Sequence, residues 1–183
     1  LLSADALFFT EERVTGAFVQ LAATGLFLLA ALTDAVDGML ARRLNAVTQV
    51  GAALDHAADK ALTTATLAAL IYVALPLHLV IAALIIVVRD VAVAGLREGL
   101  SLSGRPLPVS LFGKVKTVAE MIGIAAFLLL MTAIAMSGPP DLAALLSTAA
   151  GVTLWIAAAA AVLSGLQYAL ALRQPPKAPP ATA

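Results

Sequence analysis

Long uncharged stretches alternate with short charged or proline-containing segments along the chain. A helix that crosses the hydrocarbon layer of a membrane, roughly 30 Å thick, needs about 20 mostly apolar residues. The first stretch covers 14–33, and we expect its helix to continue past Asp34 to about residue 44. The other four stretches cover 51–75, 79–100, 112–137 and 142–172. The pattern therefore predicts an all-α, polytopic helical bundle with about five membrane-spanning helices.

The turns and the two ends of the chain are more polar than these stretches. Pro76 and the run 138–140, Gly-Pro-Pro, mark turns between helices. Residues 3–13 are too polar to cross a membrane and predict a loop or a short surface helix. The last residues, 173–183, read RQPPKAPPATA and predict an extended cytoplasmic tail. We expect one transmembrane domain over 1–172, followed by this tail.

Composition excludes several classes of protein. Hydrophobic residues make up 62% of the chain and charged residues only 12%, whereas about 25% of a typical soluble domain is charged. This excludes a soluble globular protein and a disordered chain. Eleven Lys and Arg balance eleven Asp and Glu, so no overall charge favours nucleic acid as a partner. The absence of Cys excludes disulfides, thiolate metal sites and a cysteine nucleophile.

The basic residues indicate how the helices are oriented. If the segment between the first two stretches faces the cytoplasm, ten of the eleven Lys and Arg lie at or near that side, and only Arg13 lies opposite. This distribution follows the positive-inside rule. It places residues 1–13 outside and implies a preceding helix that this sequence lacks. The ten cations are Arg42, Arg43, Lys60, Arg89, Arg97, Arg105, Lys114, Lys116, Arg173 and Lys177.

Four of the seven aspartates lie between positions 34 and 59. Asp34 and Asp37 are three residues apart, and Asp55 and Asp59 are four apart, so each pair shares one face of its helix. Because a short turn joins the two helices, all four carboxylates can converge near the cytoplasmic interface. Each costs about 2.5–3.5 kcal/mol within a membrane, which two divalent cations would offset. An all-oxygen site without Cys suits Mg²⁺ or Mn²⁺ better than Zn²⁺.

Simpler interpretations exist for these residues. The aspartates could be interfacial acids that pair weakly with Arg42, Arg43 and Lys60. Small residues in the same segment allow close approach of helices or of a flat ligand, and each taken alone is more typical of helix packing. These small residues are Gly38, Ala41 and Gly51.

The whole segment resembles the signature of the CDP-alcohol phosphotransferases, D-x2-D-G-x2-A-R-x8-G-x3-D-x3-D. Every fixed position and every spacing is matched, and chance agreement at eight specified positions is negligible. The pattern of hydrophobic segments also resembles that expected for the family's six-helix membrane fold without its first helix. The resemblance therefore covers nearly the whole chain. The matching residues are Asp34, Asp37, Gly38, Ala41, Arg42, Gly51, Asp55 and Asp59.

The resemblance implies transfer of a phosphatidyl-type group from a CDP-linked donor to an alcohol, with release of CMP and two metal ions at the donor pyrophosphate. Asp34, Asp37 and Asp55 match positions that act chiefly as metal ligands. Asp59 matches a residue that also helps to hold a metal and is the favoured base for the acceptor hydroxyl, so Asp55 and Asp59 are the expected catalytic residues. The positions around the donor are Asp34, Gly38, Ala41, Arg42 and Gly51. The family also suggests a homodimer.

A second cluster of charged residues lies between positions 89 and 120. It contains five cations and three acids, Asp90, Glu98 and Glu120. Beside a carboxylate site, such cations would bind the phosphate of a phosphorylated acceptor. The alternative is that these cations only follow the positive-inside rule. In that case the neighbouring opposite charges, Arg89–Asp90 and Arg97–Glu98, partly cancel each other. The five candidate acceptor-phosphate residues are Arg89, Arg97, Arg105, Lys114 and Lys116.

The sequence of this stretch, RDVAVAGLRE followed by GKVKT, resembles that of one branch of the family. Enzymes of that branch join CDP-diacylglycerol to glycerol 3-phosphate to make phosphatidylglycerophosphate. We therefore expect a multi-pass enzyme of the bacterial cytoplasmic (inner) membrane whose active site faces the cytoplasm. Another phospholipid synthase of the family, such as a phosphatidylinositol-phosphate synthase, stays open. A membrane transporter is the non-enzyme alternative, although no internal repeat is visible. Trp155 and Tyr168 are expected to contact lipid or the membrane interface.

Overall fold

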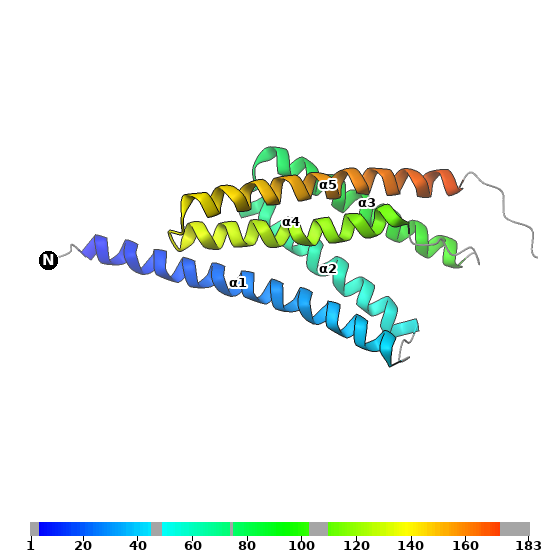
Figure 1. Cartoon of the computed structure of the whole chain (residues 1–183), viewed down its shortest axis with the longest axis horizontal. Helices are drawn as coiled ribbons and strands as arrows, with labels where there is room; N and C mark the ends of the chain where they lie inside the picture. The colour runs from blue at the N-terminus through cyan, green and yellow to red at the C-terminus, as the bar shows by residue number, and fades with distance from the viewer. Residues whose placement is uncertain (1–3, 45–48, 74, 103–109, 173–183) are drawn as a thin grey trace, which may run out of the picture.

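Five helices make up the described part of the protein in the computed structural model (Figure 1). The structure describes residues 4–44, 49–73, 75–102 and 110–172, and within them it leaves out the side chains of 4–13, 35, 41–42, 49–50, 52–53, 55–56, 101–102 and 171–172. The helices are α1 (Ala4–Arg43), α2 (Gln49–Val73), α3 (Leu77–Leu102), α4 (Leu111–Ala135) and α5 (Pro140–Leu172). The described residues contain no strand, which confirms the predicted all-α bundle.

Four of the five helices are long and apolar enough to cross a membrane. The candidate spans are Val14–Leu40, Leu77–Leu100, Leu111–Ala135 and Pro140–Leu170. α2 is not among them, because its first half carries Asp55, Asp59 and Lys60 among small residues. The chain is therefore a multi-pass membrane protein by length and composition, while the crossing of α2 stays a prediction.

The expectation for the first residues was wrong. Instead of a separate loop or short surface helix, residues 4–13 form the first turns of α1, which continues without a break to Arg43. Nothing in this segment stops a helix, because it contains neither glycine nor proline. The polarity of its side chains limits how deep it can lie in a membrane, but it does not end the helix.

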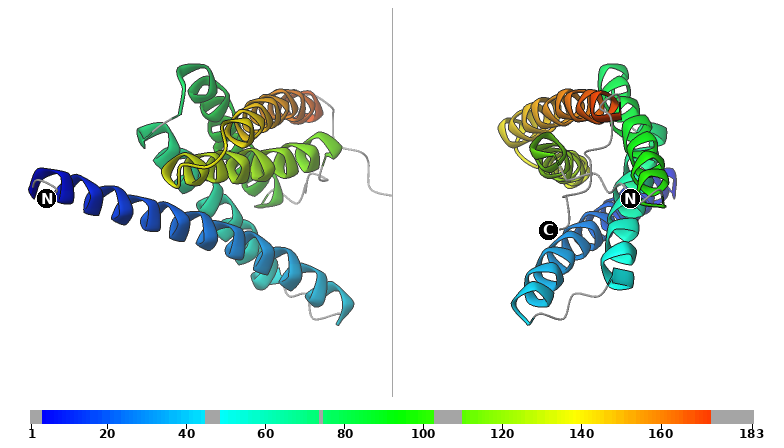
Figure 2. Two further views of the ribbon diagram at one scale, coloured as in Figure 1. Left: turned by 60° about the vertical axis from the view of Figure 1, so that its left-hand side comes forward. Right: turned by 90° about the vertical axis from the view of Figure 1, so that its right-hand side faces the viewer.

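α4 lies at the centre of the bundle and packs against α1, α2 and α5. Figure 1 shows α4 and α5 side by side, and α3 packs on the other side of α5. In Figure 2, α1 and α2 extend away from the α4–α5 pair toward the short segment that connects them. The ends of α1, α3 and α5 and the starts of α2 and α4 lie toward the same end of the bundle (Figure 1). The charged sequence segments are therefore brought to one end.

α1 is attached to α4 by hydroxyl contacts between apolar surfaces. The hydroxyls of Thr24 and Thr132 are 2.8 Å apart. Thr24 also lies 3.2 Å from the carbonyl oxygen of Leu128. Both threonines are buried, and both also reach a carbonyl of their own helix. Such contacts are suited to a membrane, because lipid offers buried hydroxyl groups no hydrogen-bonding partner.

α4 and α5 approach closely at small residues. A Cβ atom added to Gly123 of α4 would lie 2.8 Å from Leu154 Cγ and 3.0 Å from Thr153 Oγ1 of α5. The facing side of α5 is rich in buried alanine, including Ala150, Ala157 and Ala161. Without large side chains the two backbones come close enough for extensive van der Waals contact, which drives association of helices in lipid.

The turn between α4 and α5 explains their antiparallel pairing. Ser137 has a positive φ of 56°, and the N–H of Gly138 donates to the carbonyl of Ala133 at 2.7 Å. Pro140 then begins α5, where its missing N–H costs no helical hydrogen bond. This confirms the turn predicted at 138–140.

We expect Gly123→Ala to destabilise the protein and Gly151→Ala, its matched control, to leave it equally or more stable. Both changes favour the helix by about 1 kcal/mol, but a Cβ at Gly151 meets nothing within 4 Å. At Gly123 the new methyl group overlaps Leu154, and overpacking of this kind costs about 1–3 kcal/mol. Thermal unfolding in detergent micelles, followed by circular dichroism, measures the difference. Equal melting temperatures for the two variants would contradict the close packing of α4 and α5.

Candidate functional site

A cavity of about 640 Å³ opens at the charged end of the bundle, between α2, α3 and α4. Four cationic and two acidic side chains line it, which leaves an excess of two positive charges among the described groups. A cavity with this excess is suited to bind anions such as phosphate. Its lining residues are Asp59, Lys60, Arg89, Asp90, Val93, Ala94, Arg97, Gly113, Lys114, Thr117, Val118 and Tyr168.

α3 and α4 each present one face to this cavity. Arg89, Val93 and Arg97 recur every four residues along α3 and so share a face. On α4, Lys114 and Val118 are likewise four apart. The predicted acceptor cations Arg89, Arg97 and Lys114 therefore lie around one cavity.

The start of α4 is fixed by its cap. The Ser110 hydroxyl accepts a hydrogen bond from the Gly113 N–H at 3.0 Å, and this satisfies a backbone donor that a helix start leaves unpaired. A Cβ on Gly113 would lie 3.2 Å from Ser110 Oγ and 3.7 Å from an Arg89 guanidinium nitrogen. The contact with Ser110 Oγ is the tight one, so glycine at this position leaves room for the capping hydroxyl.

α2 contributes Asp59 and Lys60 to the same cavity. Lys60 Nζ lies 3.5 Å from Asp59 Oδ2, and both side chains are mostly buried. The hydroxyl of Thr63 donates to the Asp59 carbonyl at 3.0 Å. The structure therefore places one aspartate of the sequence motif in the lining of the same cavity as three of the five cations predicted to bind acceptor phosphate.

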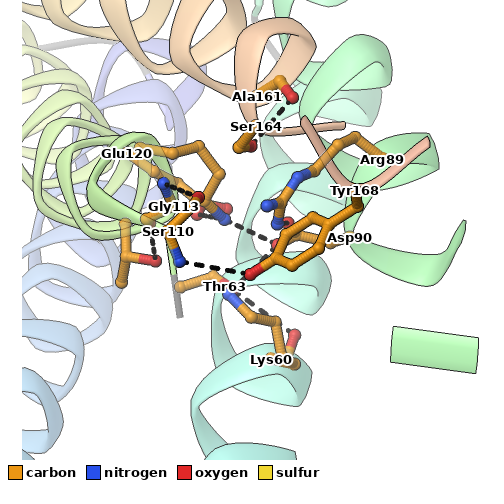
Figure 3. Close-up of polar contacts among 12 residues, drawn as sticks. Lys60, Thr63, Arg89, Asp90, Ser110, Gly113, Glu120, Ala161, Ser164 and Tyr168 are labelled. Atoms are coloured by element: carbon orange, nitrogen blue, oxygen red, sulfur yellow. Dashed lines mark hydrogen bonds and ion pairs between the residues drawn. The ribbon is translucent and has the colours of Figure 1, made fainter. Parts of the chain in front are cut away.

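Asp90 is the centre of the ion pairs in the cavity wall (Figure 3). One of its oxygens, Oδ2, accepts a hydrogen bond from Lys116 Nζ at 2.7 Å and lies 3.1 Å from Lys60 Nζ. The other, Oδ1, accepts from an Arg89 guanidinium nitrogen at 3.0 Å. One carboxylate thus joins cations from α2, α3 and α4.

Lys116 differs from the other predicted acceptor cations. Its side chain is 0% exposed, and its ammonium donates to Asp90 and to Glu120, at 2.6 Å from Glu120 Oε2. It does not line the cavity. Lys114 and Lys116 are two residues apart, about 200° around a helix, so only one of them can face the cavity. In this structure Lys116 therefore lies behind the cavity wall.

Tyr168 also lies where the sequence did not suggest. We expected it at the lipid or the interface, but it is 5% exposed and lines the cavity. Its hydroxyl oxygen accepts a hydrogen bond from the Ser110 N–H at 3.3 Å. The Arg89 guanidinium carbon lies 5.8 Å from the centre of its ring, within the range of a cation–π contact. Tyr168 thus connects α5 to the start of α4 and supports Arg89.

The other residues of the sequence motif are described only in part. The side chains of Asp34 and Asp37 are exposed on α1, Gly38 is half-buried, and Gly51 is exposed on α2. Among the described side chains, no three of the His, Asp and Glu type gather closely enough to hold a metal ion. Four predicted site residues lie wholly or partly outside the described part of the chain. They are Ala41, Arg42 and Asp55, whose side chains are not described, and Arg105, of which nothing is described.

An apolar groove of about 590 Å³ lies between α3 and α5. It shares Arg89 and Val93 with the charged cavity, and apart from Arg89 its lining is apolar or glycine. On α3 it extends from Leu84 to Leu96, about 18 Å at 1.5 Å per residue. That length is comparable to one leaflet of a hydrocarbon layer roughly 30 Å thick. A polar cavity beside a leaflet-long apolar groove can accommodate an amphiphile.

Sequence reasoning had not assigned Lys60, Asp90, Glu120 or Tyr168 to the site. One signal was available, because Lys116 and Glu120 are four residues apart on one helix and opposite in charge. That spacing would have indicated an internal pair. Nothing comparable marks Tyr168, whose place depends on how α5 packs against α3 and α4.

Known proteins resemble this chain over most of its length. The family model of the CDP-alcohol phosphatidyltransferases matches residues 6–164. A protein of Bacillus subtilis (strain 168) named CDP-diacylglycerol–glycerol-3-phosphate 3-phosphatidyltransferase is 38% identical over 150 residues, which cover 81% of this chain and 72% of that protein. Proteins of the same name from Sodalis glossinidius (strain morsitans) and Pseudomonas fluorescens are 35% and 34% identical and cover 81% and 74% of this chain, and 76% and 70% of their own lengths. The predicted family is thereby confirmed, and the chain belongs to the CDP-alcohol phosphatidyltransferases.

Proposed function

We propose that the protein transfers the phosphatidyl group of CDP-diacylglycerol to glycerol 3-phosphate, giving phosphatidylglycerophosphate and CMP. The observation that carries this proposal is the cavity in which Asp59 lies beside Lys60, Arg89, Arg97 and Lys114. A carboxylate can accept the proton of an attacking hydroxyl, and a group of cations can hold a phosphorylated acceptor. The names of the relatives support this choice of acceptor.

The chain's own residues account for binding and proton transfer. Arg97 and Lys114, with Arg89 behind them, bind the phosphate of glycerol 3-phosphate and direct its terminal hydroxyl toward Asp59. The hydroxyl oxygen forms a bond to the phosphorus that carries diacylglycerol, while the pyrophosphate P–O bond to CMP breaks. Asp59 takes the hydroxyl proton, and the electron pair of the broken bond leaves with CMP. Because both substrates are held in one cavity, the reaction gains from proximity and orientation.

Two divalent cations, Mg²⁺ or Mn²⁺, complete the proposed site. The chemistry of the donor set suits these ions, since every candidate ligand is a carboxylate, and the motif helices α1 and α2 reach the same end of the bundle as the cavity. The ions would be held by Asp34, Asp37, Asp55 and Asp59. When bound, they supply positive charge to the donor pyrophosphate and to the departing CMP. The cytidine and its phosphates would lie near Gly38, Ala41, Arg42 and Gly51.

The groove between α3 and α5 supports a lipid donor. An acyl chain of CDP-diacylglycerol would lie along the apolar lining, with the charged headgroup in the adjoining cavity past Arg89 and Val93. We place the enzyme in the cytoplasmic (inner) membrane of a bacterium with the cavity facing the cytoplasm, because the cations gather at that end of the bundle. A homodimer is the oligomeric state that the family suggests.

Release of CMP by the purified protein tests the proposed function directly. In detergent micelles containing CDP-diacylglycerol and Mg²⁺, we expect CMP to appear with glycerol 3-phosphate and to stop when EDTA removes the metal. Inositol phosphate and plain glycerol serve as competing acceptors. Faster release with inositol phosphate would replace the proposed acceptor within the same family. No release with any acceptor would count against the reaction itself.

We expect Asp59→Asn to lower the rate of CMP release at least 100-fold while the protein stays folded, because the amide keeps the volume but cannot accept the proton. Asp141→Asn is the matched control, since Asp141 lies in the first turn of α5 at the opposite end of the bundle. The turnover number at saturating Mg²⁺ and both substrates measures the effect. Near-normal turnover in Asp59→Asn would remove Asp59 from the proposed mechanism.

Lys114→Ala should raise the KM for glycerol 3-phosphate by about 10- to 100-fold, the loss of about 1.4–2.8 kcal/mol of binding, with a smaller effect on CDP-diacylglycerol. Its exposed ammonium lines the cavity and is assigned to the acceptor. Arg105→Ala, at a position outside the described residues, is predicted to act in the same direction. Lys177→Ala, in the tail, is the control. Equal increases in both KM values would show that Lys114 serves the donor or the fold.

A further inference from the structure

A group of buried charges lies behind the cavity wall and has no part in the mechanism above. We call Asp90, Lys116 and Glu120 the charge ladder. Their side chains are 5%, 0% and 1% exposed. Among them only Asp90 reaches the cavity. Buried charges in a protein core are costly unless each is closely paired, so their retention here needs an explanation beyond helix packing.

The geometry of Lys116 excludes direct contact with a ligand in the cavity. Its ammonium has no exposed surface and donates to carboxylates on both sides, 2.7 Å from Asp90 and 2.6 Å from Glu120. Lys116 is thus paired on both sides, and Asp90 is the member of the charge ladder that connects it to the cavity.

Two cavity cations are held by this one carboxylate. Lys60 of α2 lies 3.1 Å from Asp90 Oδ2, and Arg89 of α3 lies 3.0 Å from Asp90 Oδ1. Because Lys116 of α4 fixes Oδ2 from behind, Asp90 cannot rotate freely toward either cation. The charge ladder therefore fixes the positions of the Lys60 and Arg89 side chains in the cavity lining.

Lys60 and Arg89 also retain unused hydrogen-bonding capacity. Lys60 Nζ and Arg89 Nε are buried atoms without a well-aligned hydrogen-bond partner within the described part of the chain, although both groups are ion-paired with Asp90. Buried donors nearly always have an acceptor. Unlike Lys116, both side chains line the cavity and are partly exposed, 20% for Lys60 and 13% for Arg89. A rotation of these long, flexible side chains would bring the two buried nitrogens to the acceptor oxygens of an anionic ligand there.

We propose that Lys60 is a further substrate-binding residue, which contacts a phosphate oxygen, and that Asp90, fixed by Lys116 and Glu120, is the positioning residue for Lys60 and Arg89. This inference rests on the proposed function. The phosphate oxygen belongs either to glycerol 3-phosphate or to the CDP-diacylglycerol pyrophosphate, and separate KM values for the two substrates distinguish these sources.

The first experiment compares Lys60→Met with Lys60→Arg in the CMP-release assay. Lys60→Met should raise the KM of one phosphate-bearing substrate at least 10-fold, and Lys60→Arg should restore it to within about 3-fold. Asp90→Asn should raise the same KM, because the cations lose their anchor, and Asp90→Glu should restore part of it. A Lys60→Met variant that is folded and has both KM values unchanged overturns the inference.

A double-mutant cycle separates positioning by Lys116 from ligand binding by Lys116. Lys116→Met alone leaves the Glu120 carboxylate buried without a cation and should lower turnover at least 30-fold. Adding Glu120→Gln removes that charge while Asp90 keeps Lys60 and Arg89, so the double variant should recover to within about 10-fold of wild type. A double variant as impaired as Lys116→Met, with equal helix content and monodispersity, would assign Lys116 to the substrate and overturn its positioning role.

Wild-type protein assayed in parallel distinguishes the two proposals. If it releases no CMP, the proposed function fails. Binding of glycerol 3-phosphate and of CDP-diacylglycerol to wild type and to Lys60→Met, measured by calorimetry, then still tests the inference. Weaker binding of one substrate to Lys60→Met supports it, and equal binding of both overturns it.

Discussion

The carboxylate of Asp90 is the contact on which the charged end of the bundle depends. It joins Lys60 of α2, Arg89 of its own helix and Lys116 of α4. Inside a membrane the hydrophobic effect does not draw helices together, so close packing and polar contacts must do so. Among the described helices, α2 alone has no candidate membrane span, and the Lys60–Asp90 ion pair attaches its charged half to α3. The wall of the cavity is consequently built from three helices whose relative positions are set by charge.

Opposite ends of the bundle are stabilised by different means. From the α4–α5 turn to the middle of the bundle, small residues such as Gly123 and the alanines of α5 allow the backbones to approach, and threonine hydroxyls attach α1 to α4. At the other end, ion pairs replace this apolar contact and surround a cavity. Close packing leaves no space for a ligand, whereas long charged side chains around a hollow do. The charged cavity, whose lining suits anions, therefore lies at one end of the described helices.

The neighbouring apolar groove gives the cavity a second property. Arg89 contributes its guanidinium to the charged cavity and also lines the groove between α3 and α5. A substrate with a charged headgroup and acyl chains meets suitable surfaces on both sides of this residue. A soluble nucleotide would use the cavity alone, so the pairing of the two surfaces is typical of an enzyme that takes its donor from the bilayer.

Local hydropathy and the identity of residues along one helix are enough to predict the helical membrane class, the turn at 138–140, the family and the spacing of the motif aspartates. The sequence also grouped Arg89, Arg97 and Lys114, which the structure brings to one cavity. The position of Lys116 behind the cavity wall, and of Tyr168 at the cavity rather than in lipid, follows instead from the packing of the helices. Such positions depend on how each helix is rotated against its neighbours, and one residue along a helix turns a side chain by about 100°.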